Sequence, residues 1–145
     1  MRRAMELAAL AASRTPQDVP VGALVIAPDG TVLAEAANER ELTGDPTGHA
    51  ELIAMRRAAQ AIGDWHLEGC TLVVTLEPCP MCAGAISQAR VETVVFGAWD
   101  DKLGAAGSVF DLLRDRRLPH RVEVVPGVLA TECAEQLRAF FTEKR

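Results

Sequence analysis

The stretch Thr71-Leu72-Val73-Val74-Thr75-Leu76-Glu77-Pro78-Cys79-Pro80-Met81-Cys82 decides how the rest of the chain is interpreted. Its first six residues are mostly apolar and β-branched, which predicts a central strand that is buried on both faces. A helix is expected to follow from about Pro80 to Ala89. The segment therefore places Cys79 and Cys82 where a buried strand gives way to a helix.

Strands and helices alternate on both sides of this segment. The remaining predicted strands are 21–26, 31–34, 93–97 and 122–125, and the remaining predicted helices are 1–13, about 50–62 and about 131–141. The turn signal Pro28-Asp29-Gly30 joins the first two strands into a hairpin. A hairpin followed by alternating helices and strands indicates an α/β fold. We expect a three-layer αβα sandwich with a mixed five-stranded sheet and helices on both faces.

The helix at 50–62 carries an apolar stripe at helical spacing, as expected for a helix packed on a sheet. The stripe consists of Leu52, Met55, Ala59 and Ile62. Asp45 and Thr47 precede the helix as candidate caps, Gly63 ends it, and 38–48 is predicted to be a loop. The last helix is expected to turn Cys133, Leu137, Phe140 and Phe141 inward.

Length and composition fit one domain with a real core, because the chain has 145 residues and is 49% hydrophobic. No apolar run approaches the ~20 residues that span a bilayer, so we expect a cytoplasmic protein with no membrane partner. Cys70 and Cys133 lie far apart in apolar surroundings and are interpreted as buried thiols.

The charge distribution leaves two interpretations open. The formal net charge is −5, which by itself speaks against nucleic-acid binding. Residues 102–121, the basic segment, nevertheless contain five basic and two acidic residues, which gives a local charge of +3. The basic residues are Lys102, Arg114, Arg116, Arg117 and Arg121. This segment is either a solvated surface loop or a patch that holds RNA phosphates.

His49, Cys79 and Cys82 are candidate ligands of a zinc ion. An imidazole and two thiolates suit zinc, and three protein ligands leave a fourth position for water, as in catalytic sites. All three residues lie at predicted helix starts, where the helix N-terminus lowers the pKa of a thiol. A redox dithiol and a purely structural zinc are the alternatives for this group.

Glu51 follows His49 by two positions, in the first turn of the same predicted helix. There the helix can face a metal end-on, so both side chains can reach one site. A carboxylate in that position can act as general base and then as general acid. His-x-Glu alone arises often by chance, but coupled to Pro-Cys-x-x-Cys after a strand it is the signature of zinc deaminases.

With these residues in place, the chain resembles the cytidine-deaminase superfamily and, within it, the bacterial-type tRNA-specific adenosine deaminases. The resemblance covers nearly the whole chain. Its motif segments are Val19–Ala23, Asn38–Glu41, Asp45–Glu51, Thr75–Ala85, Val95–Lys102 and Gly104–Ser108, followed by His120–Val124. Trp99 departs from the pattern, which has a basic or smaller residue there, so it either stacks on a base or packs.

The resemblance implies a single zinc-dependent deaminase domain over residues 1–145, with a cytidine-deaminase-like fold and one Zn²⁺ per subunit. It implies hydrolytic deamination of the wobble adenosine in a tRNA anticodon loop to inosine, by a homodimer. A tRNA arginine with an ACG anticodon is the expected partner. The alternatives are a zinc-dependent deaminase of a free base or nucleoside, of guanine or cytosine type, and a non-catalytic zinc-stabilised RNA-binding module.

The resemblance also implies roles for individual residues. His49, Cys79 and Cys82 match the zinc ligands, and Glu51 matches the proton shuttle. The residues expected to bind the substrate are Asn38, Ala50, Pro78, Asp100, Lys102 and Phe140. From the basic segment, the residues expected at the RNA backbone are Arg114, Arg116, Arg117 and Arg121.

Overall fold

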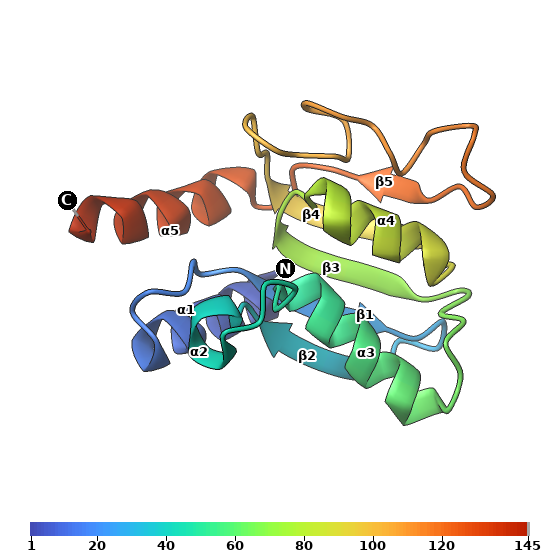
Figure 1. Cartoon of the computed structure of the whole chain (residues 1–145), viewed down its shortest axis with the longest axis horizontal. Coiled ribbons are helices and arrows are strands. Elements are labelled where there is room, and N and C mark those ends of the chain that lie inside the picture. Colours follow the sequence, from blue (N-terminus) through green and yellow to red (C-terminus); the bar gives the residue numbers. More distant parts are fainter. Residues whose placement is uncertain (145) are drawn as a thin grey trace.

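A mixed sheet forms the middle layer of the protein in a computed structural model that describes residues 1–144 (Figure 1). Within that range the sheet has five strands in the order β2-β1-β3-β4-β5. They are β1 (Gly22–Ile26), β2 (Val32–Ala37), β3 (Thr71–Leu76), β4 (Thr93–Ala98) and β5 (Glu123–Val125). β1 is antiparallel to β2 and β3, whereas β3, β4 and β5 run parallel. The prediction of β3 as the central strand is confirmed.

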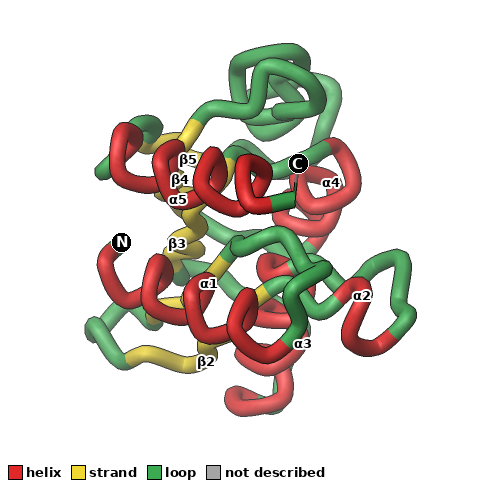
Figure 2. Tube along the Cα trace, turned by 90° about the vertical axis from the view of Figure 1, so that its left-hand side faces the viewer, coloured by secondary structure: helices red, strands yellow, loops and turns green. Residues whose placement is uncertain are grey.

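Helices cover both faces of this sheet. They are α1 (Arg2–Arg14), α2 (Arg40–Thr43), α3 (Ala50–Ile62), α4 (Pro80–Gln88) and α5 (Ala130–Glu143). α1 and α5 lie side by side on one face (Figure 2), where the Gln136 side-chain amide donates a hydrogen bond to the Met5 carbonyl at 3.0 Å. α3 and α4 cover the other face, which confirms the predicted three-layer αβα sandwich.

The sheet has an apolar core on each of its faces. The two cores are separate because successive side chains of a strand point to opposite faces. Leu24 and Val73 pack with Ala4 of α1. Their neighbours Val25 and Leu72 belong to the larger core that α3 and α4 close. No helix within residues 1–144 is both long enough and apolar enough to cross a membrane.

Two details of the predicted α3 are wrong. Ile62 is 43% exposed, because it is the last residue of the helix, whereas the buried face runs through Ala50, Ala54 and Ala58. The capping position belongs to His49 rather than to Asp45 or Thr47. Asp45 instead accepts a hydrogen bond from the Thr47 backbone N–H at 2.8 Å and shapes the turn before the helix. The predicted end of the helix at Gly63 is confirmed.

Two other expectations also need correction. The predicted loop at 38–48 contains the short helix α2. In α5, Phe140 is 9% exposed but Phe141 is 52% exposed. Successive helical residues are separated by about 100°, so both rings cannot face the sheet.

The parallel pairing of β3 and β4 brings two chain segments to one edge of the sheet. Leu76 pairs in register with Ala98, so both strands end at the same level. Beyond Leu76 the chain enters α4 through Cys79, and beyond Ala98 it enters the loop that contains Asp100. This carboxyl edge is where α/β folds place their functional sites.

Candidate metal centre

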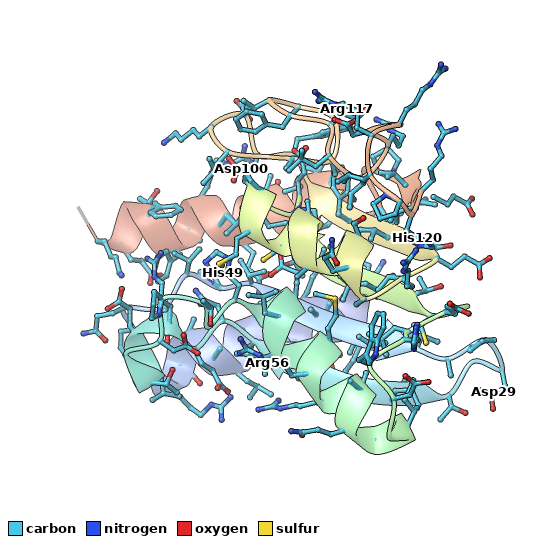
Figure 3. The ribbon with its side chains drawn as sticks, turned by 45° about the vertical axis from the view of Figure 1, so that its right-hand side comes forward. Asp29, His49, Arg56, Asp100, Arg117 and His120 are labelled. Carbon is cyan, nitrogen blue, oxygen red and sulfur yellow. The ribbon has the colours of Figure 1, made fainter. Side chains whose placement is uncertain are left out.

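The tips of α3 and α4 bring His49, Cys79 and Cys82 together. His49 and Cys79 are the N-cap residues of their helices, and Cys82 lies in the first turn of α4. The Nδ1 atom of His49 lies 3.4 Å from the Cys82 Sγ and 3.7 Å from the Cys79 Sγ. The three ligand atoms lie within 4.8 Å of one another. Figure 3 shows His49 at the end of the sheet where these helices begin.

This geometry fits a tetrahedral zinc ion. Zn–S bonds of about 2.3 Å and Zn–N bonds of about 2.0–2.1 Å, at tetrahedral angles, separate nitrogen from sulfur by about 3.6 Å. The two observed nitrogen–sulfur distances, 3.4 and 3.7 Å, lie on either side of that value. Three ligands from the protein leave one coordination position for a water molecule or a substrate.

The two cysteine side chains differ in pKa because one hydrogen bond links them. The hydrogen bond that the two side chains share lowers the pKa of Cys79 to about 4. The same hydrogen bond, with burial, raises the pKa of Cys82. Cys79 is therefore a thiolate at neutral pH, which is the form that binds zinc.

Glu51 lies beside His49, Cys79 and Cys82, which together form the donor set of the candidate metal centre, and is 4% exposed. Burial raises the pKa of its carboxyl group to about 7, although the nearby His49 opposes this effect. A group with this pKa can both accept and release a proton near neutral pH. Its placement in the first turn of α3 agrees with the predicted position.

The donor set opens into a cavity of about 160 Å³. Its lining includes the predicted site residues Asn38, His49, Ala50, Glu51, Cys79 and Asp100. Pockets for drug-sized ligands measure about 300–1,000 Å³, so this cavity admits a single base rather than a larger ligand. The site residues thus come from four separate segments of the chain.

Asn38 is fixed in the cavity wall and is 8% exposed. Its side-chain amide donates to the Val19 carbonyl at 3.1 Å, and its side-chain oxygen accepts from the Arg40 backbone N–H at 3.2 Å. An asparagine amide has two donor hydrogens and two acceptor lone pairs. One donor and one acceptor therefore remain for a ligand.

Pro78 and Lys102 lie near the cavity without lining it. The carbonyl of the buried Pro78 accepts a hydrogen bond from the Ala105 backbone N–H at 2.8 Å. Lys102 instead lines an adjoining groove, together with Trp99 and Phe141. Asp100 lines both spaces, so the groove continues from the cavity.

Phe140 does not face this groove. It is buried, and the Lys144 ammonium lies 4.1 Å from the centre of its ring. Phe141 is the exposed C-terminal aromatic, and its ring contacts that of Phe140 edge-on at 5.2 Å. Trp99 is 46% exposed and also makes an edge-on contact, with Phe96 at 4.9 Å.

The basic segment does not converge on the cavity. Arg114 pairs with Asp111 at 3.0 Å, and Arg117 pairs with Asp115 at 2.7 Å. Arg121 precedes β5, whose first residue is in register with Thr93 at the start of β4, so it lies near the edge of the sheet opposite Cys79. Figure 3 shows Arg117 and His120 displaced from His49.

Two buried carboxylates that hold the walls of the cavity were missed from the sequence. Asp18 is 1% exposed and accepts from the backbone N–H groups of Glu41 and Leu42, at 2.8 and 3.1 Å. Glu77 is likewise 1% exposed. For Glu77 the available signal was its place directly after the apolar strand β3, where a free carboxylate would be costly to bury. Asp18 follows no strand, and the sequence offered no such signal for it.

The chain belongs to the cytidine and deoxycytidylate deaminase family, because residues 1–98 match the profile of that family's zinc-binding region. Among its relatives is a tRNA-specific adenosine deaminase of Bacillus subtilis (strain 168). It is 50% identical over 128 residues, which cover 88% of this chain and 79% of the relative. A tRNA-specific adenosine deaminase of Haemophilus influenzae (strain ATCC 51907) is 45% identical over 145 residues, covering 100% of this chain and 83% of the relative.

Solved structures agree with this assignment. One comes from studies of A-to-I editing by tRNA:A34 deaminases at the wobble position of transfer RNA. It superposes with a TM-score of 0.85 at 39% identity, over 94% of this chain and 100% of that chain. The predicted cytidine-deaminase-like fold is confirmed.

Proposed function

We propose that this chain hydrolytically deaminates the wobble adenosine of a tRNA anticodon loop to inosine. The observation that carries the proposal is a zinc-type donor set beside a buried carboxyl group, in a cavity that admits one base. Its similarity to tRNA-specific adenosine deaminases at 45–50% identity supports tRNA as the substrate.

The residues of the cavity have the chemistry that this reaction needs. His49, Cys79 and Cys82 would hold the zinc, whose chemistry when bound is to acidify a water for attack on C6 of adenine. The Glu51 carboxylate takes up the proton of that water and delivers it to N1 of the base. A second proton transfer through Glu51 lets ammonia leave, so water and adenosine give inosine and ammonia.

Substrate positioning falls to the cavity walls. The remaining amide donor and acceptor of Asn38 orient the base, and the backbone of Ala50 borders it. Pro78 contributes through its carbonyl, which accepts a hydrogen bond from Ala105 of the neighbouring loop. A cavity of this size requires the base to leave its stack, which costs least in a single-stranded loop. Asp100 and Lys102 border the path of the neighbouring nucleotides, and Phe140 contributes through the Phe141 ring that it supports.

The basic segment is assigned to tRNA phosphates. Arg114, Arg116 and Arg117 are exposed and available for contacts that carry no sequence information. Arg121 lies toward the opposite edge of the sheet, so it would contact a phosphate farther from the cavity than the other three.

We further infer that residues 1–145 form one deaminase domain that acts in the cytoplasm as a homodimer with one Zn²⁺ per subunit. Light scattering should give twice the 15.5 kDa mass of the chain. Metal analysis should give one zinc per chain. A monomer that retains full activity would overturn the homodimer assignment.

The decisive experiment compares substrates with purified, zinc-loaded protein. Inosine should appear at the wobble position of a tRNA arginine transcript with an ACG anticodon, and not in free adenosine. Equal turnover of free adenine, guanine or cytosine would identify a deaminase of free bases instead. Binding of tRNA without turnover would identify a non-catalytic RNA-binding module.

A further inference from the structure

Glu77 is a buried acid that the reaction scheme above does not use. It directly follows β3, lies two residues before Cys79, and is 1% exposed. An ionised carboxylate in such a place is tolerated only when its oxygens accept hydrogen bonds. The partners of these oxygens therefore indicate what the residue does.

The partners come from one loop, residues 99–108. The Asp100 backbone N–H donates to Oε2 of Glu77 at 2.9 Å. The Ala106 and Ser108 backbone N–H groups donate to Oε1 at 3.1 and 3.0 Å. Both carboxylate oxygens are thus occupied by the backbone of a loop that borders the cavity.

The loop closes tightly over this carboxylate. At Gly104, an added Cβ would collide with Oε2 of Glu77 and with the Ser108 hydroxyl, so any larger residue would have to displace these side chains or the loop. The Ser108 hydroxyl and the Gly104 backbone N–H both donate to the Asp100 carbonyl, at 2.7 and 2.9 Å. Asp100 is therefore held at its N–H and at its carbonyl.

The same loop is tied to the segment that carries the metal ligands, through the hydrogen bond from Ala105 to the Pro78 carbonyl. Asp100 and Leu103 from the loop line the cavity together with Glu77. The loop is thus both a wall of the cavity and a neighbour of the donor set.

We propose that Glu77 is a positioning residue for substrate binding, which holds loop 99–108 in its binding conformation before the tRNA arrives. This inference rests on the proposed function. A wall that is already ordered spares the entropy cost of ordering it on binding, so the benefit falls on KM. Glu77 need not touch the reacting atoms.

The principal test is Glu77→Gln. The glutamine side chain has the same shape, but one oxygen becomes an NH₂ group that cannot accept from a backbone N–H. Its remaining oxygen can serve Asp100 or the Ala106–Ser108 pair, not both. We expect KM for the tRNA transcript to rise about tenfold, equivalent to about 1.4 kcal/mol, with kcat within about threefold and one zinc retained. Glu68→Gln makes the same chemical change at an exposed position and should leave both constants unchanged.

Hydrogen exchange separates this inference from the proposed function. In Glu77→Gln, the amides of Asp100, Ala106 and Ser108 should exchange faster, while those of α3 stay protected. This result is independent of activity, so it can be obtained even if wild-type protein forms no inosine and the proposed function fails. Unchanged exchange in the loop would overturn the positioning role.

A second variant keeps the test decisive if Glu77→Gln does not fold. Gly104→Ala retains the carboxylate, but the added Cβ overlaps Oε2 of Glu77, so the contact between the carboxylate and the loop has to change. It should give the same rise in KM with little change in kcat. A proportional loss of kcat and zinc in either folded variant would instead assign Glu77 to maintenance of the metal centre, against the proposal.

Discussion

The cavity and residues 111–121 of the basic segment are both rich in charged side chains. Three acidic side chains are buried around the cavity, whereas the arginines of the segment are exposed. Around the cavity, Asp18, Glu51 and Glu77 are at most 4% exposed, and Asp18 and Glu77 accept hydrogen bonds from backbone N–H groups. In the basic segment, Arg114 and Arg117 stay exposed and pair with acids two or three residues away. Such surface pairs contribute only about 0–1 kcal/mol to stability.

The contrast indicates that the charged groups most important for function in this protein are the buried ones. A buried ionisable group is costly, so its retention indicates a purpose that its partners identify. An exposed ionisable group has almost no desolvation cost, so its presence alone does not indicate a function. Substitutions at buried charges should therefore have larger effects than substitutions at exposed ones.

Removal of a metal ligand should have the largest effect. Cys82→Ala removes a buried sulfur from the candidate zinc ligands, so we expect loss of zinc, loss of detectable inosine formation and a lower melting temperature. Metal analysis and thermal unfolding measure the first and last of these. Cys70→Ala, a buried thiol away from the donor set, is the matched control and should keep its zinc. Full zinc content in Cys82→Ala would show that the donor set is wrongly assigned.

Glu51→Ala should leave the metal in place while turnover falls. General acid–base catalysis contributes about 10²–10⁴-fold, so a loss of kcat in that range is expected. Single-turnover kinetics on the tRNA transcript measure it. Turnover within a few-fold of wild type would contradict the shuttle role, whatever the zinc content.

Asp18→Asn should affect the part of the cavity wall that adjoins α2. The substitution weakens hydrogen bonds from Glu41 and Leu42 to a buried carboxylate, each worth about 1.5–3 kcal/mol. We expect the free energy of unfolding in urea to fall by about 1–3 kcal/mol. Asp29→Asn, at an exposed turn, is the control. Equal stability of the two variants would remove the distinction between buried and exposed carboxylates.

Charge reversal in the basic segment should have the smallest effect on the enzyme itself. Arg116→Glu with Arg117→Glu should weaken tRNA binding and lower the salt slope of log Kd by about 2, with kcat unchanged. Titrations at several salt concentrations measure this slope. Arg2→Glu, on α1, provides an exposed control. An unchanged slope would mean that the segment is a solvated loop.

Sequence alone predicted what depends on local pattern. The apolar run at 71–76 predicted β3 to the residue, and the spacing of Cys79 and Cys82 after it predicted the donor set that the tips of α3 and α4 assemble. What escaped prediction depends on long-range contacts. Glu77 and Asp18 reach partners more than twenty residues away, and no local spacing encodes those bonds.

The errors have the same origin. Phe140 and Phe141 are adjacent apolar residues, and only the orientation of α5 on the sheet decides which is buried. The charge count over 102–121 could not show that Arg114 and Arg117 are paired locally, or that Arg121 lies at the other edge of the sheet.

The contact between α5 and α1 has a consequence for the groove beside Trp99. Cys133 packs against Gly97 of β4, and Gln136 reaches Met5, 131 positions earlier in the chain, so α5 completes the face that α1 begins. His49, Cys79 and Cys82 all precede α5, whereas Phe141 of the groove belongs to it. A change in how α5 docks would therefore alter the groove while leaving the three candidate ligands on other elements.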